Sequence, residues 1–150
     1  MKQYIGTKII KAEPAYRVDG KVFVKANIVP SGVHIEDGYK VVYPDGYESW
    51  SPKDVFEAAY RATDGMSFGL AIEAAKMGKK IARAGWNGKN QYVELGHDFS
   101  YMAPGDIPVR PVQHLDIGSQ ALVFVGTRGR QVGWLASQSD MLADDWRIVE

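Results

Sequence analysis

The stretch MSFGLAIEAAKMGKKIARAGWNGKNQYVEL, residues 66–95, decides how the second half of this chain is expected to fold. Ser67 has the side chain of a helix N-cap, and the apolar residues after it recur at the spacing of one helical face. These apolar residues are Phe68, Ala71, Ile72 and Ala75. Gly78 is the residue type that commonly ends a helix, because it adopts a positive φ without steric cost. The sequence therefore predicts a helix that begins after Ser67 and ends near Gly78.

Strand patterns follow this helix. Residues 80–86 and 91–95 predict two strands, and Asn87-Gly88 between them favours the positive φ angles of a tight hairpin turn. Residues 121–125 and 131–135 predict a second strand pair, turned by residues 127–130. The region 97–118 carries Pro104, Pro108 and Pro111 and little periodicity, which predicts a long ordered loop or a partly mobile lid. Residues 137–140 (Ser-Gln-Ser-Asp) predict the cap of one short helical turn, and residues 146–149 alternate like a closing strand.

Upstream of Met66, the first 63 residues predict strands followed by one helix. Residues 39–43 alternate like a strand, and Pro44-Asp45-Gly46 has the composition of a tight turn. Ser51 is the expected N-cap of the helix, with Pro52 at its first position and Asp54 at its third. Apolar residues at helical spacing then predict a helix of about ten residues that runs to Ala62.

A methionine placed directly before a fresh capped helix resembles the start of a free-standing protein. On this basis two modules are predicted, residues 1–64 and 65–150, although a methionine that falls there by chance within one domain explains the pattern equally well. The predicted fold class is α+β. A helix packs on an antiparallel β-sheet in the C-terminal module, and a small α+β module precedes it.

Composition excludes several classes of protein. The chain has 150 residues, of which 45% are hydrophobic, and no cysteine, so the fold depends on neither disulfides nor thiolate metal sites, and a reducing, intracellular compartment is expected. No apolar run approaches the roughly 20 residues that span a bilayer, and the N-terminus lacks the apolar core of a signal peptide, so no membrane partner is expected. The 18 basic residues balance the 18 acidic ones, which argues against a duplex nucleic acid as partner. A small anionic ligand needs only one or two basic groups and stays possible.

The sequence lacks the common catalytic signatures. His34, His97 and His114 show no metal-ligand spacing, so neither a metal nor another cofactor is predicted. Neither a G-x-S-x-G elbow nor a glycine-rich phosphate loop that ends in Lys-Ser or Lys-Thr is present. Asp144-Asp145 can in principle supply an acid and a base, but adjacent side chains more often point in different directions. The chain is therefore expected not to be an enzyme.

Tryptophan is concentrated in the second half of the chain, which holds three of the four indoles. Stacking of a base on an aromatic ring is worth roughly 1–3 kcal/mol, and neighbouring polar side chains can read base edges and ribose hydroxyls. The alternative is that each indole fills a small core. Trp146, in an alternating strand, is the best candidate for core. Trp86 and Trp134 are flanked by glycine and polar residues and are the better candidates for the walls of a pocket.

Arginine and polar residues near these indoles complete the candidate site, because arginine can hold a phosphate through two parallel hydrogen bonds. The predicted ligand-binding residues are Trp86, Asn87, Arg83, Arg110, Trp134, Ser137, Gln138 and Asp140. A drug-sized pocket of roughly 300–1,000 Å³ would take up much of the core of so small a module. The site is therefore expected at an interface between subunits of a homo-oligomer.

Three motifs in order connect the second half to a known family. They are MSFGLAIEA (66–74), GKKIARAGWNGK (78–89) and WLASQSDMLADDW (134–146). Together these motifs closely resemble the second family of phage Thoeris anti-defence proteins. This sequence departs from the family pattern at Val132-Gly133, where Val-Pro is common in the family. Residues 1–63 lie outside it and resemble a small phage domain without a settled activity.

The resemblance implies a function. Members of the family act as sponges: a homotetramer binds glycocyclic ADP-ribose, the signal of the Thoeris TIR enzyme, and holds it without cleavage. Some members also bind cyclic dinucleotides of the CBASS defence system at a separate site. The resemblance thus implies an anti-defence sponge in the cytoplasm of the infected bacterial host. Two alternatives stay open, an enzyme that degrades a cyclic nucleotide and a phage structural or host-protein-binding accessory protein.

Overall fold

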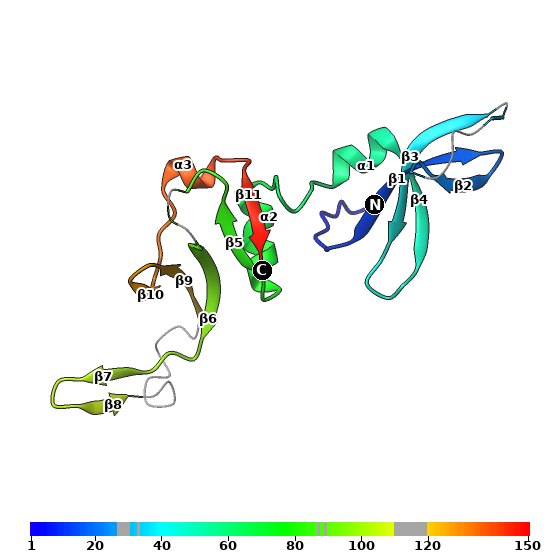
Figure 1. The fold of residues 1–150 in the computed structure, drawn as a ribbon. Coiled ribbons are helices and arrows are strands. Elements are labelled where there is room, and N and C mark those ends of the chain that lie inside the picture. Colours follow the sequence, from blue (N-terminus) through cyan, green and yellow to red (C-terminus); the bar gives the residue numbers. More distant parts are fainter. Residues whose placement is uncertain (27–30, 33, 87, 89, 110–119) are drawn as a thin grey trace. The chain divides into compact units, whose positions relative to one another are not determined.

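The computed structural model describes residues 1–26, 31–32, 34–86, 88, 90–109 and 120–150 (Figure 1). The chain divides into two compact units, Met1–Arg61 and Ala62–Glu150. They are called unit 1 and unit 2 below, and each is described by itself. None of the helices among the described residues is long and apolar enough to cross a membrane.

Unit 1 is an antiparallel sheet followed by a helix. Its elements are β1 (Lys11–Val18), β2 (Lys21–Val24), β3 (Ile35–Val42), β4 (Glu48–Pro52) and α1 (Lys53–Ala59). The strand order is β2-β1-β3-β4, and each neighbouring pair is antiparallel. The predicted turn at Pro44-Asp45-Gly46 is confirmed, since the Gly46 N–H donates to the Tyr43 carbonyl at 2.9 Å and Gly46 has a φ of +86°.

Gly38 lets strand β4 lie very close to strand β3 in unit 1. A Cβ on Gly38 would lie 2.2 Å from the Ser51 carbonyl oxygen and 2.6 Å from the Trp50 ring, so only glycine fits on β3 at this point. Helix α1 contacts β3 and β4. The Phe56 ring stacks on Tyr39 with 4.0 Å between the ring centroids, and Tyr60 stacks on Phe56 at 4.9 Å. Aromatic stacking thus attaches α1 to the sheet.

The predicted start and end of α1 are wrong. Ser51 pairs with Tyr39 in the β-ladder, so its backbone is extended and strand β4 continues through Pro52. Pro52 is therefore the N-cap residue, and no side chain caps the helix. At the other end Tyr60 is extended, with φ −120° and ψ 149°, so α1 ends at Ala59 and does not reach Ala62.

Unit 2 is built on a second antiparallel sheet, with helix α2 (Phe68–Lys76) before it in the chain. Its strands are β5 (Lys80–Arg83), β6 (Tyr92–His97), β9 (Gln120–Gly126), β10 (Gly129–Val132) and β11 (Trp146–Val149). Their order in the sheet is β10-β9-β6-β5-β11, and all neighbours are antiparallel. Helix α2 packs on β5, β6 and β11 (Figure 1). The predicted α+β class, with a helix on an antiparallel sheet, is confirmed.

Helix α2 has the predicted ends, but its face is predicted correctly only in part: Ala71 and Ala75 are buried, Phe68 and Ile72 are partly buried, and the buried Ala74 was not predicted. The Ser67 hydroxyl accepts a hydrogen bond from the Leu70 N–H at 3.4 Å, and Gly78 follows the helix with a φ of +84°. Its buried face consists of small side chains, those of Ala71, Ala74 and Ala75. Small side chains let the helix lie close to the sheet, where these alanines share a core with Ile81, Val93 and Trp146.

The predicted strand 80–86 is too long. Strand β5 ends at Arg83, a turn begins at Ala84, and the connection to β6 spans residues 84–91 instead of 87–90. The Ala84 N–H still donates to the Asp145 carbonyl, in the register of β5 with β11, whereas the Gly85 N–H donates to the Asp145 carboxylate. The Gly85 N–H is thus bound by a side chain and not by a neighbouring strand. Asn87 lies outside the described residues.

The predicted loop over residues 97–118 is also wrong in part, since it contains a two-stranded hairpin of β7 (Tyr101–Ala103) and β8 (Ile107–Val109). Gly105 and Asp106 both have a positive φ, of 87° and 58°, which suits the tight turn between these strands. Pro108 is tolerated because this small sheet has only edge strands. Residues 110–119 lie outside the described part of the chain.

The last third of the chain follows the predicted order. Strands β9 and β10 form a hairpin around Thr127 and Arg128, so Gly129 and Arg130, which were predicted in the turn, belong to β10. Strand β10 ends at Val132 because Gly133 has a φ of +86°, and Trp134 therefore lies outside the strand that was predicted for 131–135. The short helix α3 (Gln138–Met141) and the closing strand β11 are confirmed.

Candidate functional site

Three indoles of unit 2 converge on one place. Trp146, the first residue of β11, is fully buried, and Phe68 of α2 packs against its ring at 5.4 Å. Trp86 and Trp134 contact the Trp146 ring edge-on at 5.5 and 6.2 Å, and their own centroids are 6.0 Å apart. All three pairs have interplanar angles between 72° and 76°, the edge-to-face geometry that aromatic rings favour. We call these three residues the indole cluster.

The two outer indoles are half-buried. Trp86 follows the turn after β5, where its backbone N–H donates to the Arg83 carbonyl at 3.4 Å. Its ring also contacts Phe124, with 5.7 Å between the ring centroids. Trp134 follows β10, and its backbone N–H donates to the Leu122 carbonyl at 3.0 Å. Both rings pack against the core of unit 2 and keep part of their surface exposed. They can therefore serve the core and a ligand together.

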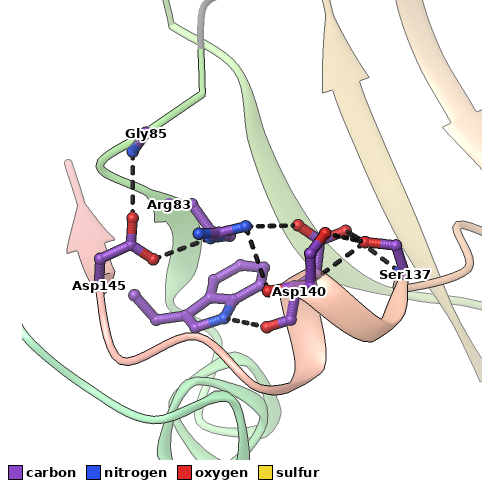
Figure 2. A network of polar contacts seen from close by, with 7 residues as sticks. Arg83, Gly85, Ser137, Asp140 and Asp145 are labelled. Atoms are coloured by element: carbon purple, nitrogen blue, oxygen red, sulfur yellow. Dashed lines mark hydrogen bonds and ion pairs between the residues drawn. The ribbon is translucent and has the colours of Figure 1, made fainter.

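Beside the indole cluster lies an ion-pair network that Figure 2 shows in close view. The Arg83 Nε donates to Asp145 Oδ1 at 2.8 Å, and its Nη1 donates to Asp140 Oδ1 at 3.1 Å and to the Ser139 carbonyl at 3.3 Å. In Figure 2 the guanidinium lies between the two carboxylates. We call Arg83, Asp140 and Asp145 the Arg83 clasp. It joins the end of β5 to helix α3 and to the residue before β11.

The start of α3 is held by a capping box. The Ser137 hydroxyl accepts the Asp140 N–H at 3.1 Å, and the Asp140 carboxylate accepts the Ser137 N–H at 3.1 Å. The same carboxylate accepts the Ser137 hydroxyl at 2.7 Å. In addition, the Trp146 indole N–H donates to the Asp140 carbonyl at 2.8 Å. Asp140 thus links the cap, the clasp and the indole cluster.

The clasp keeps its acidic groups ionised. Burial raises the pKa of the Asp140 carboxyl, but hydrogen bonds from Ser137 and Arg83 outweigh this effect and hold that pKa below its usual value. The hydrogen bond from Arg83 lowers the pKa of Asp145, and the Gly85 N–H adds to this effect. Asp145 and Asp140 in turn raise the pKa of the Arg83 guanidinium. One cation therefore faces two anions, and the clasp has a net negative charge.

The structure brings together five of the residues that the sequence predicted for the site: Arg83, Trp86, Trp134, Ser137 and Asp140. Gln138 is the first residue of α3, is exposed, and makes no side-chain hydrogen bond with the described residues. Asn87 and Arg110 lie outside the described part of the chain. Whether these side chains bind a ligand stays a prediction.

Sequence reasoning missed Asp145 and Phe124. Asp145 was considered only as half of an acid–base pair with Asp144, whereas the structure engages it with Arg83 and Gly85 and leaves Asp144 exposed. The register of β11 against β5, which pairs Trp146 with Arg83, would have placed Asp145 near the guanidinium. Phe124 belongs to the predicted strand 121–125, but its contact with Trp86 depends on the order of the strands.

The fold and the site define unit 2 as a small α+β module with an aromatic cluster and a polar helix cap at one end of its sheet. Residues 66–149 match the model of the Thoeris anti-defense 2-like domain. A relative from Bacillus phage SP01, named "Thoeris anti-defense 2", is 37% identical over 91 residues, which cover 56% of this chain and 94% of the relative. The chain therefore belongs to the Thoeris anti-defense 2-like family, as its motifs indicated.

Proposed function

We propose that this protein is an anti-defence sponge of a phage, which binds a cyclic nucleotide immune signal and holds it without cleavage. One observation carries the proposal: 56% of this chain aligns with 94% of the length of a phage relative named for Thoeris anti-defence. Glycocyclic ADP-ribose is the proposed ligand, and cyclic dinucleotides are a second class to test. The proposed place of action is the cytoplasm of the infected bacterial host.

The indole cluster supports binding of a planar ligand. Trp86 and Trp134 are both partly exposed, and their ring centroids lie 6.0 Å apart, so each can stack on a base for roughly 1–3 kcal/mol. Gln138 offers an exposed amide on α3, which follows Trp134 in the chain. An amide can donate to and accept from a base edge or a ribose hydroxyl.

Capture of a scarce signal requires more than two stacked rings. Nanomolar affinity corresponds to about −12 kcal/mol, well beyond what two stacking contacts supply. Further contacts must come from other residues, and a second subunit is their proposed source. Three large apolar side chains close to the site in sequence are exposed: Leu135 at 89%, Leu142 at 79% and Val132 at 58%. Exposed apolar surface favours association, so we propose a homo-oligomer, and a tetramer as the family resemblance implies.

The proposal is tested by recovery of the ligand. The full chain is incubated with glycocyclic ADP-ribose and, separately, with cyclic dinucleotides, then washed and heat-denatured, and the released molecule is identified by mass spectrometry. Intact ligand in a fixed ratio to protein supports a sponge. A linear or shortened product would instead show an enzyme that degrades the signal.

A thermal-shift measurement completes this test. A ligand present at 100 times its dissociation constant stabilises the folded state by about 2.7 kcal/mol, which raises the melting temperature. If no nucleotide of the panel raised it, the sponge proposal would fail. A structural or host-protein-binding role would then be the better explanation.

A further inference from the structure

Arg83 has more than one possible task in a nucleotide site. An arginine near a ligand pocket usually suggests a contact with phosphate, and the sequence alone favours that interpretation. The structure gives Arg83 different partners, because three of its hydrogen bonds go to Asp145, Asp140 and the Ser139 carbonyl. These bonds use the Nε–H and both hydrogens of Nη1.

The charge of the clasp argues against an anionic ligand at Arg83. The carboxylates of Asp140 and Asp145 both accept from the guanidinium, and they leave the cluster with a net negative charge. The side chains of Arg83 and Asp140 are 21% and 16% exposed, so water screens their charges only in part. A pyrophosphate that approached Arg83 would meet two carboxylates with it.

The clasp instead holds the segments that carry the indoles. Asp145 accepts the Gly85 N–H at 3.2 Å through its carboxylate and the Ala84 N–H at 3.1 Å through its carbonyl, and this fixes the turn that leads directly into Trp86. Figure 2 shows that the two Asp145 carboxylate oxygens have different partners, Gly85 for one and Arg83 for the other.

Asp140 acts on the other side of the clasp. Its carboxylate closes the capping box with Ser137, three residues after Trp134, and its carbonyl accepts the Trp146 indole N–H. Trp146 contacts both outer indoles edge-on. The clasp therefore reaches Trp86 through the turn after β5, and Trp134 through α3 and Trp146.

We propose that Arg83, Asp140 and Asp145 are positioning residues, which fix the orientation of Trp86 and Trp134 for ligand binding and do not contact the ligand themselves. This inference rests on the proposed function, since it assigns roles within the same site. It reassigns Arg83 and Asp140 from ligand contacts to supports of the aromatic walls. The anionic groups of the ligand must then be bound by residues outside the clasp.

Removal of one carboxylate distinguishes the two roles of Arg83. Asp145→Asn takes away a negative charge beside the guanidinium. If Arg83 binds the phosphate, its positive field is less compensated in this variant, and affinity for glycocyclic ADP-ribose increases. If the clasp positions the indoles, affinity falls roughly tenfold, which corresponds to re-ordering one or two aromatic side chains on binding.

The experiment measures affinity by calorimetry and the environment of the indoles by near-ultraviolet circular dichroism, on the full chain. Asp145→Asn should weaken binding and change the indole spectrum. Arg83→Lys should do the same, because an ammonium keeps the charge but lacks the planar fork that bridges two carboxylates. Glu94→Gln is the matched control, since it breaks the Arg130–Glu94 ion pair on other strands of the same sheet and should change neither quantity.

The possible results separate the two proposals. Unchanged or tighter binding by Asp145→Asn overturns the positioning role, as does weaker binding by Arg83→Lys with an unchanged indole spectrum. Should Asp145→Asn fail to fold, Arg83→Lys gives the decision by these criteria. If the wild-type chain binds none of the nucleotides, the sponge proposal fails by itself. In that case an unchanged indole spectrum in Arg83→Lys overturns the proposal that the clasp orients the indoles, and a changed spectrum supports it.

Discussion

Trp86 and Trp134 each belong partly to the core and partly to the surface of unit 2. Their rings contact the fully buried Trp146 at 5.5 and 6.2 Å, and both residues remain partly exposed. A substitution at either position therefore changes packing as well as any ligand contact. Because both rings pack against the core, truncation of either one should also lower the stability of unit 2.

The first prediction concerns Trp134→Ala and Trp86→Ala. Each should weaken binding of glycocyclic ADP-ribose roughly 5- to 150-fold, which corresponds to the loss of one stacked base at about 1–3 kcal/mol. Each should also lower the melting temperature. Calorimetry well below the melting temperature of each variant separates the two effects. Trp50→Ala in unit 1 is the control, and unchanged affinity in both unit 2 variants would rule out these indoles as pocket walls.

Acid should weaken unit 2 through the Arg83 clasp. The pKa values of Asp140 and Asp145 are lower in the folded state than their usual value, which is about 3.9 in an unfolded chain. At a pH between the folded and the unfolded pKa, the unfolded state thus binds more protons than the folded state. The stabilising contribution is complete above the unfolded pKa and is lost as the pH falls through the folded pKa.

The second prediction compares the free energy of unfolding of the wild type with that of Asp145→Asn, by urea denaturation from about pH 6 to about pH 2. Stability of the wild type should fall as the pH drops below about 4, with a shallower fall in the variant. Acidic residues that do not share Arg83 titrate equally in both proteins, so the difference reports the carboxyl of Asp145, which faces Arg83 and the Gly85 N–H, together with its effect on Asp140 through the shared guanidinium. Parallel curves would mean that this carboxyl has no stabilising partner in the folded state.

At the scale of elements, the approach of β4 to β3 depends on Gly38. A Cβ at this position would fall 2.2 Å from the Ser51 carbonyl oxygen, and a backbone atom cannot move aside as a flexible side chain can. The Trp50 ring, at 2.6 Å from the same point, would have to move too. The pairing of these two strands also positions α1, because α1 follows β4 directly in the chain.

The third prediction is that Gly38→Ala destabilises unit 1 by roughly 1–3 kcal/mol or more, as overpacking of a tight contact typically does. Gly69→Ala provides the contrast. A Cβ at this helical position of α2 has only the Ser67 Oγ near it, at 4.0 Å, and alanine favours the helix over glycine by about 0.5–1 kcal/mol. Chemical denaturation should show the two substitutions moving stability in opposite directions. Equal stability of Gly38→Ala and wild type would disprove the close contact.

Helix α3 shows how a short element can be specified locally. It has only four residues, Gln138–Met141, yet two backbone donors at its start are satisfied by its capping box. The Ser137 side chain accepts the Asp140 N–H, and the Asp140 side chain accepts the Ser137 N–H. The sequence 137–140 therefore predicted its position correctly. The same Asp140 carboxylate takes part in the ion pair with Arg83, which no local pattern indicates.

At the scale of the whole molecule, the exposed apolar side chains of unit 2 need an explanation. Leu135 and Leu142 are 89% and 79% exposed, and they lie on either side of α3 in the chain. Water contact of such side chains is unfavourable by roughly 1.5–3 kcal/mol for each leucine, compared with burial. Contact between copies of unit 2 is the proposed way to bury them.

The fourth prediction tests this association. Multi-angle light scattering should give the wild type the mass of an oligomer, and Leu135→Glu should shift it to a smaller mass, because a carboxylate in an apolar interface is costly. Val55→Glu is the matched control, since Val55 is also an exposed apolar side chain, 60% exposed, but in unit 1. A monomeric wild type, or a Leu135→Glu variant of unchanged mass, would contradict an interface at Leu135.

The sequence by itself determined the elements that depend on neighbouring residues. Ser67 and Gly78 set the ends of α2, the alternation of residues 146–149 set β11, and apolar residues at helical spacing predicted part of the face that α2 turns to the sheet, namely Ala71 and Ala75. Single residues of the candidate site, such as Trp86 and Trp134, could also be chosen by their polar and glycine-rich surroundings. These features are local because caps, turns and periodicity act over a few residues.

Only the tertiary structure decided how distant residues meet. Arg83 lies 57 and 62 positions from Asp140 and Asp145, and their contact depends on β11 lying beside β5 in the sheet. The same order brings together three indoles that the sequence presents as separate, and it places the Asp145 carboxylate where it accepts the Gly85 N–H. Side-chain partners follow from strand order and register, which local patterns do not encode.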